Sequence, residues 1–127
     1  MTRKKRKVPK TAMARYRAEL KLKQTELASA FGVSEGTYRD WEKGQLPAWL
    51  RLACKGFAFC RLAGIRYEDW DGDHVVQARK RLALTQTSLA MALELSRATI
   101  GRYEAGTPPK WMAYAVMALA FDRAPEP

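Results

Sequence analysis

The side chains of this 127-residue chain that are best suited to chemistry are its cations. Lys and Arg number 23 against 13 Asp and Glu, which gives a net charge of +10. Residues 1–10 hold six of these cations and no acid, namely Arg3, Lys4, Lys5, Arg6, Lys7 and Lys10. A short run of this kind favours a polyanionic partner, either nucleic acid or, less readily, an anionic membrane. A tail that only raises solubility is the alternative interpretation.

The other reactive residue types do not form a catalytic pattern. The sequence holds one histidine, His74, and it has neither a Gly-rich phosphate loop nor a Cys–His or carboxylate pair at a catalytic spacing. Cys54 and Cys60 stand six residues apart in a helical pattern, so their side chains diverge and we expect reduced thiols. The acids between 68 and 73 are too few for a cation site. We therefore expect no enzyme, no metal and no cofactor.

Hydrophobic residues make up 47% of the chain, which is enough for a buried core. No apolar run approaches the roughly 20 residues that span a bilayer. No continuous apolar segment follows the basic N-terminus, as it would in a secretory signal. We expect a cytoplasmic protein without a membrane partner.

One short pattern occurs twice in the chain, 62 residues apart. The segments QTELASAFGVSEGTYRDWEKG (24–44) and QTSLAMALELSRATIGRYEAG (86–106) are identical at nine of 21 aligned positions. The same offset relates residues outside these segments, including Arg17 and Arg79, Trp49 and Trp111, and Phe59 and Phe121. The sequence therefore contains an internal duplication of a unit of roughly 60 residues. We place the first unit at 12–71 and the second unit at 72–127, after an arm at 1–11.

The apolar spacing inside each unit is helical, so we expect an all-α protein with four or five helices per unit. In the first unit, Ser34 follows a break in the pattern and suits the N-cap of a third helix. Tyr38 and Trp41 face inward from that helix, and Gly44 ends it. Pro47 then opens a fourth helix, where its missing N–H costs nothing. The same features recur in the second unit at Ser96, Ile100, Tyr103, Gly106 and Pro109.

The segment between the two units, residues 63–74, combines acids with Tyr67 and Trp70. Gly64 is suited to end the fourth helix of the first unit. Asp71-Gly72-Asp73 has the composition of a turn. We expect Asp73 to cap the first helix of the second unit and the segment to be a short, partly packed junction.

Two short helices joined by a tight turn and braced by flanking helices form a helix-turn-helix. The sequence resembles the XRE family, the phage Cro-like and lambda-repressor-like DNA-binding domains. The matching features are a helix that opens with Gln, a following xxLA, a turn with an apolar residue and Ser, and a helix that ends in aromatic-Glu-x-Gly. The resemblance covers about residues 12–60 and 74–121. It implies two tandem units that bind double-stranded DNA; a helical bundle with no DNA role is the alternative.

In this family an Arg of the first helix often pairs with a Glu near the end of the recognition helix. Arg17 and Glu42 have the required spacing, and Arg79 and Glu104 repeat it in the second unit. A planar guanidinium suits bidentate contact with a carboxylate. The resemblance therefore implies two structural ion pairs that fix the recognition helices and do not read bases.

The resemblance places the recognition helices near 34–43 and 96–105. In the second unit it implies base contacts from Arg97, Ala98, Thr99 and Arg102, and backbone contacts from Gln86 and Ser96. Each of the two guanidinium groups suits bidentate contact with guanine O6 and N7, which discriminates by about 1–3 kcal/mol. Ala98 suits contact with a thymine methyl, and Gly101 leaves room for close approach.

The first unit departs from the second in its charges. The base-reading positions there are Glu35, Gly36, Arg39 and Asp40, and the implied backbone contacts are Lys23, Gln24, Ser34, Thr37 and Lys43. The two acids repel phosphates unless they face cytosine amino groups. The first unit therefore reads different bases, binds more weakly or has another task; we favour DNA contact by both units, with the second unit as the sharper reader.

These residues together favour a sequence-specific transcriptional regulator of phage or mobile-element type, a repressor in preference to an activator. The arm of Arg3, Lys4, Lys5, Arg6 and Lys7 would add salt-sensitive contacts to the DNA backbone, although the same run also resembles a nuclear-import signal. A homodimer and a contact with RNA polymerase are further partners to test. An antitoxin-like interaction module and an architectural or excision-directing DNA binder are the alternative functions.

Overall fold

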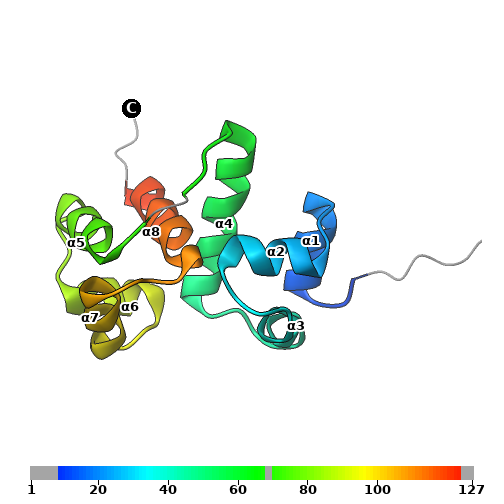
Figure 1. The fold of residues 1–127 in the computed structure, drawn as a ribbon, viewed down its shortest axis with the longest axis horizontal. Coiled ribbons are helices and arrows are strands. Elements are labelled where there is room, and N and C mark those ends of the chain that lie inside the picture. The colour runs from blue at the N-terminus through cyan, green and yellow to red at the C-terminus, as the bar shows by residue number, and fades with distance from the viewer. Residues whose placement is uncertain (1–8, 68–69, 124–127) are drawn as a thin grey trace, which may run out of the picture.

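A computed structural model of the chain describes residues 9–67 and 70–123 (Figure 1). This part of the chain is entirely helical outside its loops, which confirms the all-α fold with two tandem helix-turn-helix units. Its helices are α1 (Ala12–Leu20), α2 (Gln24–Phe31), α3 (Glu35–Lys43), α4 (Ala48–Ala63), α5 (Gly72–Arg81), α6 (Gln86–Leu93), α7 (Arg97–Ala105) and α8 (Lys110–Arg123). Of these helices, none has the length and apolar character that a membrane span requires.

Polar side chains start most of the helices at the expected places. Ser34 Oγ accepts a hydrogen bond from the Thr37 amide at 3.1 Å, and Ser96 accepts one from the Thr99 amide at 3.1 Å. These bonds satisfy amides that the first turn of a helix leaves free. The cap expected at Asp73 is wrong: Asp71 is the extended residue before α5, and its carboxylate accepts from the His74 amide at 3.1 Å. Asp73 already lies inside α5, so its side chain cannot be the N-cap of that helix.

The two proline-led helices start slightly later than their sequence suggests. Pro47 occupies the N-cap position and α4 begins at Ala48, while α8 begins at Lys110, after Pro109. Glycine ends α4 as expected, because Gly64 adopts φ 70°, in the left-handed region that glycine enters at little cost. At the ends of α2 and α6 the same conformation falls on Gly32 and on Glu94, which are equivalent residues of the two units.

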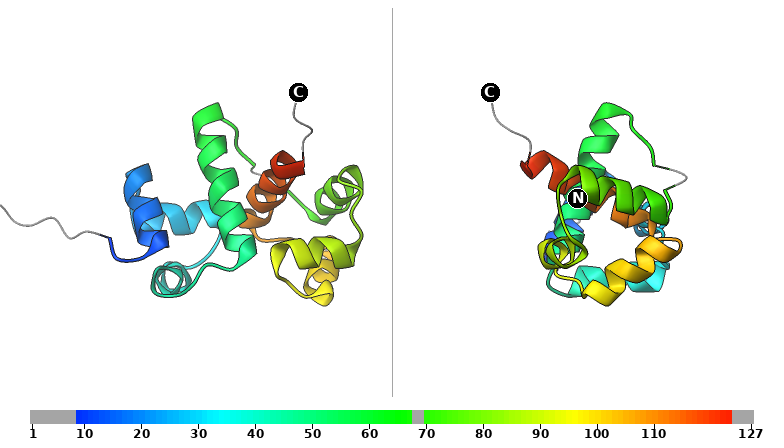
Figure 2. Two further views of the ribbon diagram at one scale, coloured as in Figure 1. Left: turned by 180° about the vertical axis from the view of Figure 1, so that it is seen from behind. Right: turned by 90° about the vertical axis from the view of Figure 1, so that its left-hand side faces the viewer.

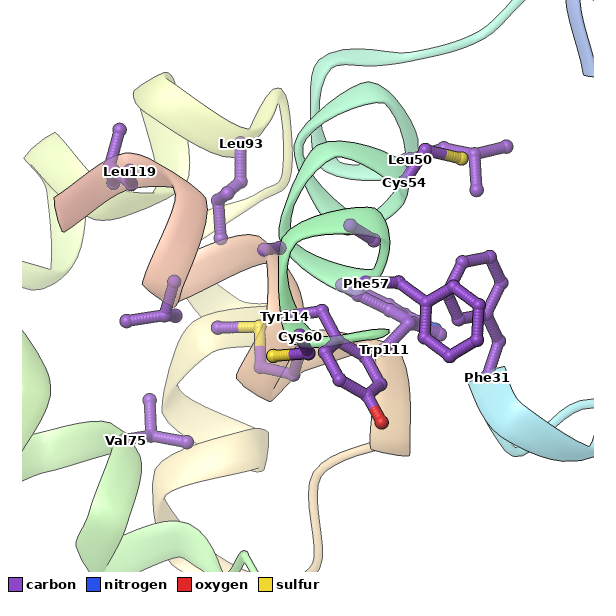
Figure 3. Packing of buried hydrophobic residues seen from close by; sticks show 14 of the residues in the cluster. Phe31, Leu50, Cys54, Phe57, Cys60, Val75, Leu93, Trp111, Tyr114 and Leu119 are labelled. Atoms are coloured by element: carbon purple, nitrogen blue, oxygen red, sulfur yellow. The ribbon is translucent and has the colours of Figure 1, made fainter. Parts of the chain in front are cut away.

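A single hydrophobic core runs through both units. It includes Phe31 and Leu50 of the first unit together with Leu93 and Leu119 of the second (Figure 3). The most extensive contact between any two of the described helices is that of α4 with α8. The two units are thus joined by shared apolar packing as well as by the chain, while the boundary at 71–72 stays a prediction.

Equivalent residues of the two units meet at the contact between α4 and α8. The rings of Trp49 and Trp111 lie 4.4 Å apart between centroids, and the rings of Phe59 and Phe121 also lie 4.4 Å apart. Each pair is related by the 62-residue offset of the duplication. A surface that contacts its own copy is the signature of a two-fold relation. The fold is therefore an approximate two-fold dimer built within one chain.

This arrangement determines where the recognition helices lie. The helices α1–α3 flank the α4–α8 pair on one side, and α5–α7 flank it on the other (Figure 1). The helices α3 and α7 lie at the same edge of the molecule in all views (Figures 1 and 2). The helix α4 begins near that edge and ends at the opposite one (Figure 1).

The two cysteines are buried in this core. Cys54 and Cys60 are free thiols, with 7% and 1% of their surface exposed. Burial raises the pKa of Cys54 to about 12, although a hydrogen bond with Tyr16 opposes the shift. A thiol that stays protonated at neutral pH is a poor nucleophile and metal ligand. Both cysteines act as apolar core residues.

Candidate nucleic-acid interface

The helix α7 presents one face to the core and the opposite face to solvent. Ile100 is fully buried and Tyr103 is half-buried, as the sequence predicts. Arg97, Ala98 and Arg102 are exposed. The guanidinium groups that the sequence assigns to base reading therefore lie outside the core.

A chain of hydrogen bonds holds Arg102 over the first turn of α7. Its Nη2 donates to Thr99 Oγ1 at 3.2 Å, and Thr99 Oγ1 lies 2.8 Å from Ser96 Oγ. Thr99 is half-buried, so its side chain is less accessible to solvent than those of Arg97 and Arg102. Holding a long side chain in place before binding lowers the entropy lost on binding. Arg102 is thus a partly preorganised donor.

The helix α3 has the same construction with different outward charges. Tyr38 is fully buried, whereas Glu35, Gly36, Arg39 and Asp40 are exposed. Under the duplication Glu35 takes the place of Arg97, and Asp40 takes the place of Arg102. Two equivalent positions on the exposed faces of the recognition helices therefore carry opposite charges.

Each recognition helix is tied to its first helix by an ion pair. Arg17 Nε lies 2.7 Å from Glu42 Oε2, and Arg79 Nε lies 2.8 Å from Glu104 Oε2. The second nitrogen of each guanidinium reaches the other carboxylate oxygen at 3.4 Å and 3.1 Å, respectively. Both pairs expected from the sequence are present and are bidentate. The guanidinium groups also donate to the carbonyls of Leu22 and Leu84, which fixes the turn before the second helix of each unit.

The glutamines at the starts of α2 and α6 complete these networks. Gln24 Nε2 donates to Glu42 Oε1 at 3.1 Å, and Gln86 Nε2 donates to Glu104 Oε1 at 3.1 Å. Burial by itself would raise the pKa of Glu42 and Glu104, but the hydrogen bonds from arginine and glutamine outweigh it and hold both pKa values below their usual level. The structure thus shows each glutamine bracing its recognition helix; a phosphate contact by the same side chains stays a prediction.

A cationic hollow lies beside α3. It has a volume of about 290 Å³, and its lining includes Lys10, Gln24, Arg39 and Lys43. Three basic residues line it, from the segment before α1 and from α3, beside Glu42, whose carboxylate is paired with Arg17. This excess of cations suits contact with a phosphate. The sequence predicts an arm contact for Lys10 and a base contact for Arg39, and the fold brings both residues to the same hollow.

The remaining backbone contacts expected from the sequence have simpler surroundings. Lys23, Ser34 and Ser96 are exposed at the starts of α2, α3 and α7, and Thr37 is exposed in the first turn of α3. Lys23 gives α2 no side-chain cap, but its own backbone amide donates to Glu26 Oε1 at 3.0 Å, whereas Thr85 caps α6 through its hydroxyl. The arm residues Arg3, Lys4, Lys5, Arg6 and Lys7 lie outside the described residues.

A comparison of the sequence with known protein families agrees with the helix-turn-helix fold. The family model HTH_3, described as Helix-turn-helix, matches residues 13–48 and again residues 75–110, together more than half of the chain. The chain belongs to the XRE-type helix-turn-helix family. Helix-turn-helix proteins of this type are DNA-binding regulators and are typically not enzymes. No curated protein and no solved structure matches the chain.

The two family matches contain the proposed contact residues of the four central helices of this helix-turn-helix protein, while the basic arm precedes the first match. They include α2 and α3 in the first unit and α6 and α7 in the second, and they leave out most of α4 and α8. The contact between α4 and α8 therefore lies largely outside the matched segments. This contact joins the two units and so determines how the two recognition helices are placed relative to each other.

Proposed function

We propose that one chain binds double-stranded DNA as a preassembled dimer, with α3 and α7 in successive segments of the major groove. The observation that carries this proposal is the position of both recognition helices at one edge, on either side of the two-fold contact of α4 with α8 (Figure 2). Helix-turn-helix dimers place two such helices about one DNA turn, ~34 Å, apart. The N-terminus of α4 also lies near this edge (Figure 1), and helix N-termini favour phosphates.

The two half-sites differ in sequence under this proposal. Arg97 and Arg102 on α7 suit a half-site with guanines, because guanine offers two acceptors in the major groove. Glu35 and Asp40 on α3 suit cytosine amino groups, and Arg39 supplies a cation for a guanine or a phosphate. The chain therefore binds an asymmetric site in one orientation, unlike a homodimer on a palindrome.

The biological setting that we propose is transcriptional repression by operator occupancy, in a phage or a mobile element within the bacterial cytoplasm. Occupation of an operator by a compact binder blocks access without any catalytic step. The basic arm with Lys10 and Lys43 would supply salt-dependent affinity that is independent of sequence. Each phosphate neutralised adds roughly 0.9 to the slope of log K against log salt.

Selection of bound duplexes from a random pool, followed by footprinting, tests the proposal. We expect an asymmetric motif with two half-sites, and we expect Arg97→Ala with Arg102→Ala to abolish base preference in the α7 half-site alone. Arg66→Ala is a control for loss of positive charge, because Arg66 is exposed and follows the C-terminal end of α4, outside the recognition helices. A motif unchanged by the double substitution would contradict the assignment.

A second function is favoured by the exposed acids of α3. Glu35 and Asp40 could bind a basic protein in place of DNA, as in an interaction module. Glu35→Gln with Asp40→Asn separates the two functions. If α3 reads cytosines, the substitutions change the selected bases of one half-site; if α3 binds a protein, they leave the DNA motif intact and weaken a protein complex.

A further inference from the structure

Four aromatic rings form a continuous row between the two recognition helices. The ring of Trp41 in α3 meets that of Trp49 in α4 at 5.5 Å between centroids and an angle of 71°. Trp49 meets Trp111 of α8 at 4.4 Å, and Trp111 meets Tyr103 of α7 at 6.0 Å and 81°. We call these four residues the aromatic row.

The row is symmetric about its centre. Trp41 and Tyr103 are equivalent under the 62-residue offset, and so are Trp49 and Trp111. The closest ring contact, between Trp49 and Trp111, therefore lies on the approximate two-fold axis. Each half of the row reaches from this axis to one recognition helix. A change at the centre would move α3 and α7 relative to each other.

The ends of the row sit beside other fixed points. Trp41 precedes Glu42, which Arg17 holds at 2.7 Å, and Tyr103 precedes Glu104, which Arg79 holds at 2.8 Å. The ion pair fixes each recognition helix to the first helix of its own unit, and the ring contact with Trp49 or Trp111 links it to the pair of tryptophans that joins the two units. Trp111 is 5% exposed and the other three rings are half-buried, so the row is a packed part of the structure.

The other contacts between the two units do not connect α3 with α7. The Phe59–Phe121 pair lies at the far ends of α4 and α8 and is 40% and 48% exposed. The Arg51–Glu94 pair is exposed and has a separation of 3.4 Å. The core rings of Phe31, Phe57 and Tyr114 join α2, α4 and α8, and Phe31 also meets Trp41 of α3 at 6.1 Å, but none of the three meets a ring of α7. Among the described residues, only the aromatic row reaches ring by ring from α3 to α7.

We infer that the aromatic row sets the separation of the two DNA half-sites that the chain accepts. The inference rests on the proposed function, in which α3 and α7 bind one duplex together. One additional base pair between the half-sites moves them ~3.4 Å further apart and turns one about the DNA axis by roughly 34°, because a turn holds about 10.5 base pairs. A rigid row cannot follow this change, so the four residues act as positioning residues for spacing specificity.

The test uses the full chain and duplexes that carry both selected half-sites, with the spacer shortened or lengthened by one and two base pairs. Wild type is expected to lose about tenfold in affinity for each added or removed base pair, because the second unit can no longer engage fully. Trp49→Leu with Trp111→Leu is expected to reduce this loss to about threefold or less, because looser units tolerate altered spacing. Affinity for each isolated half-site should stay unchanged.

The matched control is Phe59→Leu with Phe121→Leu, which removes the other symmetric aromatic pair from the same two helices. It should keep the wild-type spacing preference. Trp49→Phe with Trp111→Phe is the milder variant, for use if the leucine variant does not fold; it keeps a ring at each position and should broaden the preference by an intermediate amount.

The outcomes separate the inference from the proposed function. A wild type without any spacing preference would overturn the proposed function. A wild type with a sharp preference that survives both tryptophan variants would overturn the inference alone. Equal loss of affinity at all spacings in the tryptophan variants would also overturn it, since the row would then only stabilise the fold.

Discussion

Gly56 offers a sharp test of the contact between α4 and α8. Gly56 lies inside α4 and faces Tyr114 of α8. A Cβ atom at Gly56 would lie 2.0 Å from the carbonyl oxygen of Tyr114 and 2.7 Å from its carbonyl carbon. Ordinary contact begins at 3.4 Å, so the Gly56→Ala substitution forces the two helices apart by about 1.4 Å. The obstacle is backbone, which cannot rotate away as a side chain can. The substitution therefore displaces one unit against the other.

The stability change follows from two opposing terms. Overpacking of a core costs typically 1–3 kcal/mol, and we take about 3 kcal/mol because the clash involves backbone on both helices. Alanine is favoured over glycine in a helix by about 1 kcal/mol. The Gly56→Ala variant should thus be less stable than wild type by about 2 kcal/mol.

Gly101→Ala is the matched control, because Gly101 also lies inside a helix and a Cβ there would meet nothing within 4 Å. It should stabilise the fold by up to about 1 kcal/mol. Urea denaturation followed by far-ultraviolet circular dichroism measures both changes. A Gly56→Ala variant as stable as wild type, with its two-half-site affinity intact, would refute the helix contact described here.

Three further predictions concern the ion pairs and Tyr38. The Arg79→Ala substitution should cost about 3 kcal/mol in urea denaturation, because it leaves the 8%-exposed Glu104 unpaired; Arg17→Ala should cost less, because its pair is more exposed. The folded-state pKa values of Glu42 and Glu104 are lowered, so their contribution to stability is complete above the unfolded pKa of about 4.3 and is lost as pH falls through the folded values. Calorimetric Tm should therefore fall less steeply below pH 4.5 in Glu104→Gln than in wild type. Tyr38→Phe should change stability by no more than about 1 kcal/mol, because the buried Tyr38 hydroxyl lies beside the Arg17–Glu42 pair without a well-aligned hydrogen bond; a loss of more than about 2 kcal/mol would contradict this.

Features that depend on short stretches of sequence could be predicted. The duplication, the caps at Ser34 and Ser96 and the inward pair of Ile100 and Tyr103 each follow from local spacing. The ion pairs came from the family resemblance, which transfers a contact between distant residues that spacing alone does not specify. Local rules failed by small amounts, as at Asp71, where either of two neighbouring aspartates could have been the cap.

The packing of one unit on the other could not be predicted in the same way. That contact joins residues about 60 positions apart, and no local pattern determines which face of α4 meets α8. Two signals were present without being decisive: Trp49 and Phe59 recur as Trp111 and Phe121 at the duplication offset. The repetition of large apolar residues in the two units is equally compatible with two separate cores. Only the structure shows that the equivalents contact each other.

The hydrogen bond from Arg102 to Thr99 and the hollow shared by Lys10 and Arg39 were also beyond sequence reasoning. Both depend on side-chain conformations and on segments that the fold brings together. They refine the expected interface without changing its location on α3 and α7.

The most direct measurement of the central claim is a hydroxyl-radical footprint on the selected duplex, combined with the mass of the complex in solution. We predict one chain per duplex and two protected segments on one face, centred ~10 base pairs, one turn, apart. A complex of two chains on that site, or protection of a single segment by one chain, would contradict it.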